Sequence, residues 1–166
     1  MQIYLVQHGE AKPETEDPER PLTDKGRRDV EASARYAAAL GAEVAQILHS
    51  GKLRAKQTAE VLMQFLLPSQ GIREGKGLAP LDDPHLAERL VGQSEEPLMI
   101  VGHLPHLSRL ASLLILGIPE KEVIKFTMGG VVCLTKSDDR WLIKWALTPE
   151  VMGKQTPAKE LRGKNG

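Results

Sequence analysis

Three side chains suited to phosphoryl chemistry stand just beyond short apolar segments of this sequence. His8 and His103 each adjoin a glycine directly after such a segment, and Arg54 comes shortly after a third. A neutral imidazole can attack phosphorus, and a guanidinium binds phosphoryl oxygens through several fixed N–H groups. A glycine beside each histidine lets the backbone turn sharply and lets a ligand approach closely. Brought together, these groups would bind a phosphate or phosphoryl group.

The pattern of apolar residues predicts strands that alternate with helices along most of the chain. We expect strands over residues 2–7, 44–49, 98–101, 129–136 and 141–147, the last two joined as a hairpin. We expect helices from Thr23 to Leu40, over 53–66 and 85–91, and from residue 104 or 105 to 116. The stretches 9–22 and 71–84 are predicted loops, the second with a short extended piece. This order favours an α/β fold, a three-layer α/β/α sandwich with a mostly parallel central sheet.

The predicted sheet would bring the three side chains to one edge. Ligands of such folds bind beyond the carboxyl ends of the strands. If the three apolar segments are neighbouring strands, His8, Arg54 and His103 converge there. The helices that begin just before Arg54 and just after His103 would aim their N-termini at the same point, and such N-termini favour anions. The sequence therefore predicts a phosphate pocket.

Composition excludes several classes of protein. The chain has 166 residues, 22 of them basic and 22 acidic, so it lacks the basic surplus expected of a nucleic-acid binder. The longest strongly apolar stretch, 110–118, is far shorter than the roughly 20 residues of a membrane-spanning helix. The N-terminus shows no feature of a signal peptide, so we expect a cytoplasmic protein. Cys133 is the single cysteine, and we expect it to be a buried apolar residue within a strand.

Other residues with reactive or aromatic side chains have simpler interpretations. His103 and His106 are spaced like metal ligands, but no third ligand follows at a fitting distance, so we expect no metal site and place His106 on a helix face. Trp141 and Trp145 alternate along one predicted strand, which places both on the same face of the sheet.

Five segments in order resemble one family. The sequence is similar to the histidine phosphatase superfamily, in its small branch of SixA-type phosphohistidine phosphatases. The resemblance rests on Gln7-His8-Gly9-Glu10-Ala11, Arg20-Pro21-Leu22-Thr23-Asp24-Lys25-Gly26, the segment from Ser50 to Ala59, the segment from Leu78 to Pro84, and Val101-Gly102-His103-Leu104-Pro105. It implies a phosphoglycerate-mutase-like fold and one catalytic domain over residues 1–150. Residues 151–166 carry four basic side chains and one acidic one, with few large apolar groups, so their composition predicts a basic, flexible C-terminal tail.

The resemblance also implies roles for individual residues. His8 would be the nucleophile that forms a phosphohistidine intermediate, and Arg54 and His103 would bind the phosphoryl oxygens. Further phosphate contacts would come from Gln7, Gly9, Arg20 and Ser50, although Arg20 has an equally simple interpretation as a surface arginine in an acidic loop. Any general acid would be Glu10, Asp82 or Asp83. No cofactor and no metal are implied.

One position departs from the family pattern. Gln7 stands where the family has an arginine that shares the phosphate, and its amide offers N–H donors without charge. We therefore expect a weakened phosphohistidine phosphatase acting on a phosphorylated protein. Two alternatives stay open: a catalytically impaired, phosphate-dependent binding module, and a general phosphomonoesterase acting on small phosphate esters. We expect neither nucleic acid nor a membrane as a partner.

Overall fold

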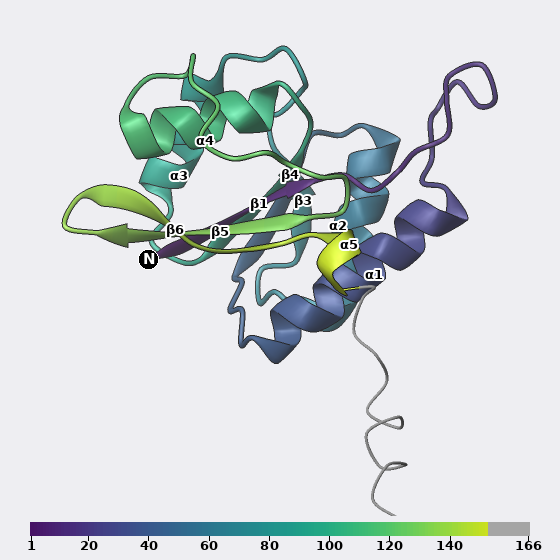
Figure 1. Cartoon of the computed structure of the whole chain (residues 1–166), viewed down its shortest axis with the longest axis horizontal. Coiled ribbons are helices and arrows are strands. Elements are labelled where there is room, and N and C mark those ends of the chain that lie inside the picture. Colours follow the sequence, from purple (N-terminus) through teal and green to yellow (C-terminus); the bar gives the residue numbers. More distant parts are fainter. Residues whose placement is uncertain (153–166) are drawn as a thin grey trace, which may run out of the picture.

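A computed structural model of the chain describes residues 1–152 and shows a six-stranded sheet with helices on both faces (Figure 1). The strands lie in the order β3-β2-β4-β1-β5-β6. Their bounds are β1 Gln2–Gln7, β2 Gln46–His49, β3 Ile72–Glu74, β4 Leu98–Gly102, β5 Val131–Ser137 and β6 Arg140–Leu147. The pairs β1–β4, β2–β4 and β2–β3 are parallel, and the hairpin of β5 and β6 extends the sheet antiparallel to β1.

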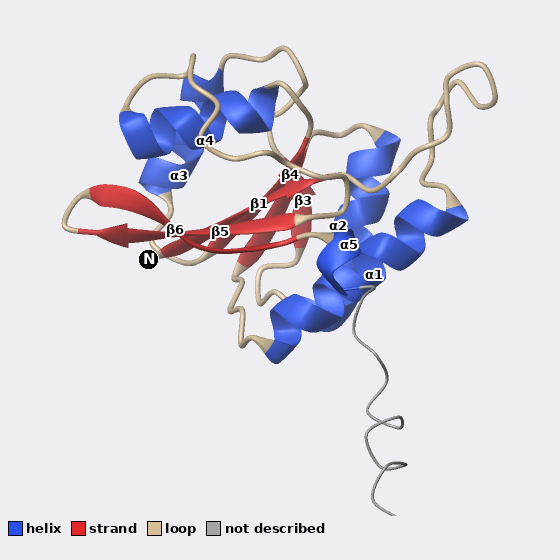
Figure 2. Cartoon of the chain, in the orientation of Figure 1, coloured by secondary structure: helices blue, strands red, loops and turns tan. Residues whose placement is uncertain are grey.

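Two apolar layers hold the helices against the sheet. Helices α1 (Asp24–Ala39) and α2 (Leu53–Leu66) cover one face, and α3 (Pro84–Gln93) and α4 (His106–Leu116) cover the other (Figure 2). Along β1, Tyr4 and Val6 pack in the first layer, whereas Ile3 and Leu5 pack in the second. This alternation follows from the two-residue period of a strand. The predicted α/β/α sandwich with a mostly parallel sheet is confirmed.

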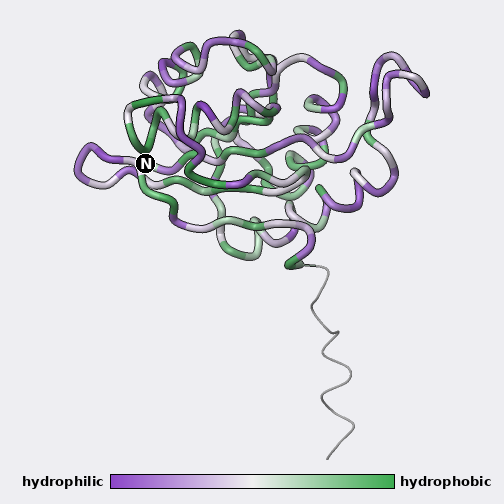
Figure 3. Tube along the Cα trace, turned by 45° about the horizontal axis from the view of Figure 1, so that its top comes forward, coloured by the Kyte–Doolittle hydropathy of each residue, from purple (hydrophilic) through white to green (hydrophobic). Residues whose placement is uncertain are grey.

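The loop between β1 and α1 projects from the body of the molecule and is mainly hydrophilic (Figures 1 and 3). Its two sides meet at an isolated antiparallel bridge between Ala11 and Leu22. The Thr23 hydroxyl then accepts a hydrogen bond from the Gly26 N–H and begins α1, as predicted. None of the helices within residues 1–152 has both the length and the apolar composition that a bilayer span requires.

The two tryptophans of β6 lie on opposite faces of the sheet, so their predicted common face is wrong. Trp141 packs in the layer under α3 and α4, whereas Trp145 packs against Tyr4 in the other layer. The register explains the difference: Cys133 pairs with Trp145 and Leu134 pairs with Ile143, so β6 carries one extra residue. Such a bulge inverts the alternation of side chains beyond it.

Several predicted boundaries shift slightly. The second strand begins at Gln46 rather than at residue 44, and Pro105 caps α4 instead of lying in its first turn. His106, expected on a helix face, is fully buried. A short helix, α5 (Pro149–Met152), was not predicted; its Met152 is buried and α5 contacts α1. The predicted tail therefore lies outside the described residues except for Val151 and Met152.

Candidate active site

The side chains predicted to converge do lie together at the carboxyl edge of the sheet. His8 follows β1, Ser50 follows β2 and His103 follows β4, and β4 lies between the other two strands. Arg54 reaches this edge from the first turn of α2, and its Nε lies 3.3 Å from Nε2 of His8. The ring centroids of His8 and His103 are 5.0 Å apart. We call His8, Arg54 and His103 the candidate site.

Hydrogen bonds indicate which nitrogen of His8 is free to react. Its Nδ1 lies 2.7 Å from the carbonyl oxygen of Gly9, a contact in which the ring must donate. A neutral imidazole then has no proton on Nε2, and this atom accepts a hydrogen bond from Nε of Arg54. Burial lowers the pKa of His8 to about 4. The hydrogen bond to Gly9 raises this pKa, whereas the positive charges of Arg54 and Arg20 lower it. The ring therefore has an available electron pair on Nε2 at neutral pH.

This low pKa sets the acid limit expected for catalysis. The ring is neutral above about pH 4 and loses its nucleophilic electron pair as the pH falls through that value. We expect the acid limb of kcat/KM to lie well below the ordinary histidine value of about 6.5. The check is a pH profile with p-nitrophenyl phosphate, corrected for the phosphate's own pKa of about 6. A corrected limb at the ordinary histidine value would contradict a neutral, buried nucleophile.

Thr58, to which no role was assigned from the sequence, holds the loop of His8 against α2. The N–H of Gly9 donates to Oγ1 of Thr58 over 3.0 Å, and that hydroxyl donates to the carbonyl of Arg54 over 2.7 Å. Gly9 is required here because a Cβ would lie 2.8 Å from Cγ2 of Val30. Thr58 lies within the segment 50–59 that resembles the family, which was the available sequence signal for a role. Its partner Gly9 lies 49 residues away in the chain, so the sequence could not identify the bond.

Positive charge gathers around the candidate site. The N-terminus of α2 has no side-chain cap, so its free N–H groups remain for an anion. Burial lowers the pKa of Arg54, and the nearby charge of Arg20 lowers it further. Arg20 itself donates from Nε to the carbonyl of Lys12 over 3.2 Å. Its positive charge also contributes to lowering the pKa of His8.

His103 is a neutral partner of the same group. Its Nε2 lies 2.6 Å from Oγ of Ser50, and the side chain is 2% exposed. Burial lowers its pKa to about 3, with smaller contributions in the same direction from His8, Arg54 and Lys52. A bound anion would raise the pKa of His103 again, because its negative charge stabilises the protonated ring. Since Nδ1 is fully buried, Nε2 is the nitrogen able to meet a ligand.

The three carboxylates considered as general acids have other partners. Oε1 of Glu10 accepts a hydrogen bond from the Thr23 hydroxyl, and Oδ2 of Asp82 accepts one from the Ala79 N–H. Asp83 caps α3 by accepting from the N–H of His85. Among residues 1–152, none of the three forms a hydrogen bond or ion pair with His8, Arg54 or His103.

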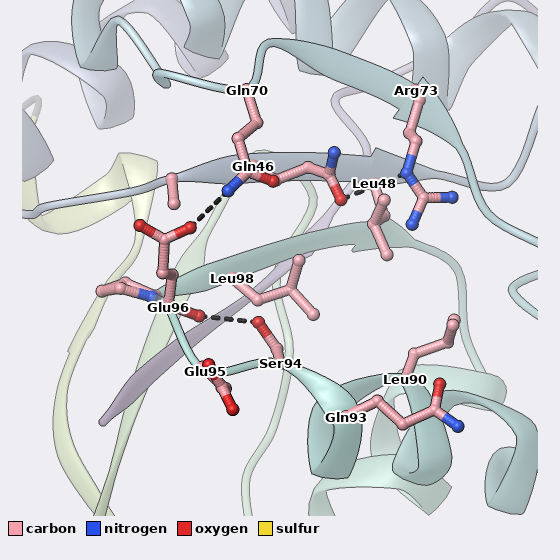
Figure 4. A pocket seen from close by; sticks show the side chains of 12 residues that line it. Gln46, Leu48, Gln70, Arg73, Leu90, Gln93, Ser94, Glu95, Glu96 and Leu98 are labelled. Atoms are coloured by element: carbon pink, nitrogen blue, oxygen red, sulfur yellow. Dashed lines mark hydrogen bonds between the residues drawn. The ribbon is translucent and has the colours of Figure 1, made fainter.

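A separate hollow lies at the opposite edge of the sheet. It has a volume of about 470 Å³ and lies at the amino ends of β2 and β4, between Gln46, Arg73 and Glu96 (Figure 4). Gln70 bonds to Glu96 there, and Nε of Arg73 donates to Gln46. This position is remote from the carboxyl ends of the strands, so the hollow is separate from the candidate site.

Comparisons with known proteins agree with this geometry. The sequence profile of the histidine phosphatase superfamily (branch 1) matches residues 3–97, which include His8 and Arg54. A protein of Picosynechococcus is 36% identical over 125 residues, which span 70% of this chain and 74% of that protein. Phosphohistidine phosphatase SixA of Escherichia coli is 24% identical over 155 residues, or 90% of this chain and 94% of SixA.

The fold has a close counterpart among solved structures. The protein histidine phosphatase SixA complexed with tungstate superposes with a TM-score of 0.79 at 24% identity, covering 92% of this chain and 99% of that one. Together, the match to the profile and the shared fold support a phosphatase activity. Two histidines and an arginine lie together at the carboxyl edge of the sheet. The chain belongs to branch 1 of the histidine phosphatase superfamily.

Proposed function

We propose that this protein is a phosphohistidine phosphatase that removes the phosphoryl group of a phosphorylated protein through a covalent intermediate on His8. The observation that carries the proposal is the unprotonated Nε2 of a neutral, buried His8, which accepts a hydrogen bond from Nε of Arg54 over 3.3 Å. The tungstate in the related SixA structure supports the choice of ligand, because tungstate is a tetrahedral oxyanion like phosphate.

The proposed reaction has two displacement steps. In the first, Nε2 of His8 attacks phosphorus, and the bond between phosphorus and the substrate nitrogen breaks with its electron pair leaving on that nitrogen. In the second, water attacks the phosphohistidine, the bond to Nε2 breaks, and inorganic phosphate leaves. An imidazole leaves more readily than an alkoxide, so the substrate nitrogen needs less help from a general acid.

The surrounding residues would act by position and charge. Arg54, Arg20 and the N-terminus of α2 would bind the phosphoryl oxygens, with the Ser50 hydroxyl and Nε2 of His103 as further contacts. The Gly9 N–H, expected from the sequence to be another contact, already donates to Thr58. These groups supply the charge stabilisation that phosphoryl transfer requires, so we propose a reaction without a metal or cofactor. Residues 1–150 would form the catalytic domain.

Gln7 is expected to limit the rate. It supplies neutral donors in place of a guanidinium, and a charged hydrogen bond contributes about 1.5–3 kcal/mol. We therefore expect Gln7→Arg to raise kcat/KM on a phosphohistidine peptide by about 10- to 150-fold. The matched control is Gln2→Arg, at the other end of β1. If Gln7→Arg is no faster than wild type, another group such as Arg20 already compensates for the missing charge.

The two alternatives predict different outcomes with the same protein. A phosphate-dependent binding module would bind phosphohistidine peptides without releasing phosphate or forming a covalent product. A general phosphomonoesterase would hydrolyse small phosphate esters at least as well as phosphohistidine peptides. Comparing kcat/KM on the two substrate classes separates both from the proposed function.

A further inference from the structure

Three large apolar side chains stand exposed on loops at the carboxyl edge of the sheet, where the candidate site lies. Leu81, Leu104 and Met128 are 85%, 41% and 42% exposed. A single exposed apolar residue is ordinary in a soluble protein, because polar groups cannot cover the whole surface. Several around one binding site are different, since exposed apolar surface of this kind is typical of contact with a ligand or a partner protein.

Leu104 and Met128 belong to the two loops that adjoin the histidines of the candidate site. Leu104 directly follows His103, which is the first residue beyond β4. Met128 directly precedes Gly129, and the N–H of Gly129 donates to the carbonyl oxygen of His8 over 3.2 Å. One apolar residue is therefore the chain neighbour of His103, and the other is the neighbour of a residue hydrogen-bonded to His8.

Leu81 stands on a turn that packs against the end of β4. The Ala79 N–H donates to Oδ2 of Asp82 over 2.9 Å, and the Asp82 N–H donates to the carbonyl oxygen of Ala79 over 3.2 Å, so the turn is closed by two hydrogen bonds. Just before it, the carbonyl oxygen of Leu78 lies 3.7 Å from the point where a Cβ of Gly102 would stand. Since Gly102 is the last residue of β4, this turn lies at the same carboxyl edge.

We propose that Leu81, Leu104 and Met128 form an apolar rim that receives apolar residues flanking a phosphohistidine on a partner protein. The position of the rim determines its occupant. While the candidate site holds a phosphoryl group, the residues next to the phosphohistidine lie against the loops that carry the rim. Contact between apolar side chains there removes apolar surface from water and stabilises the complex. This inference rests on the proposed function and narrows the substrate class to phosphohistidine set among apolar side chains.

Two synthetic phosphohistidine peptides test the rim, one with leucines on both sides of the phosphohistidine and one with serines. Wild-type protein should show a kcat/KM about 10-fold higher on the leucine peptide. Leu81→Ser, Leu104→Ser and Met128→Ser should each reduce this preference by about two- to fivefold. None should change hydrolysis of the free amino acid phosphohistidine by more than about twofold, because it has no flanking residues. The control is Leu116→Ser, at the other end of α4 from the candidate site.

Binding of the same two peptides, measured by fluorescence anisotropy, separates the rim from the proposed function. Tighter binding of the leucine peptide without any hydrolysis would support the rim and defeat the proposed function. Equal binding and equal kcat/KM of the two peptides with wild-type protein would overturn the rim, even if both are hydrolysed. Variants that lose activity on free phosphohistidine as much as on the leucine peptide would also overturn it. Thermal unfolding of each variant identifies any that fails to fold, and the wild-type comparison needs no variant.

Discussion

Replacing His8 with asparagine is expected to reduce kcat/KM by about four orders of magnitude or more, as the loss of a covalent nucleophile does. Asparagine keeps a short N–H donor that can reach the carbonyl of Gly9, the acceptor of the present 2.7 Å contact. It has no counterpart of Nε2, the atom that would attack phosphorus. The change therefore removes the reacting electron pair while preserving much of the local packing.

The measurement combines turnover with trapping of the intermediate. Wild-type protein incubated with a labelled phosphodonor and quenched in alkali should carry label on His8, because phosphohistidine survives alkali whereas acyl phosphates do not. His8→Asn should carry none, and His85→Asn should behave like wild type because His85 is exposed and pairs with Asp83. Residual turnover above about one per cent in His8→Asn would show that the reaction does not pass through this ring.

Replacing Arg54 with lysine is expected to lower kcat/KM by about 100- to 1,000-fold, the range for removing a main stabiliser of transition-state charge. Lysine keeps the positive charge, but its single ammonium cannot both reach Nε2 of His8, as Nε of Arg54 does at 3.3 Å, and hold two phosphoryl oxygens. The fall should appear mainly in kcat, because these contacts strengthen as charge develops in the transition state.

Arg73→Lys is the matched control for this change. Arg73 lies on β3 and donates from Nε to Gln46 at the opposite edge of the sheet, so it presents the same group remote from the candidate site. Steady-state kinetics of both variants on one substrate make the comparison. Equal activity of Arg54→Lys and Arg73→Lys would show that charge alone, without the planar guanidinium, satisfies the site.

Local sequence patterns predicted most of the elements that carry the candidate site. β1 and α2 have the predicted bounds, and α1 begins at the predicted cap of Thr23. These features depend on neighbouring residues only: a period of apolar side chains, a hydroxyl at an N-terminus, and a proline after the helix. The convergence of His8 and His103 was also predictable, because parallel strands bring their carboxyl ends to one edge.

Contacts between distant parts of the chain decided the rest. The extra residue in β6 places Trp141 and Trp145 on opposite faces of the sheet, and only the pairing of β6 with β5 reveals it. The bond from Gly9 to Thr58 crosses from the end of β1 to α2, and no local pattern specifies that distance.

By itself, the sequence determined that this is an α/β protein with two histidines and an arginine at one edge of a sheet. Only the tertiary structure decided which nitrogen of His8 is unprotonated, that the charge of Arg20 helps to lower the pKa of this ring, and that His106 is fully buried. The physical reason is that proton position and pKa depend on burial and on the few groups in contact, and these come from elements far apart in the chain.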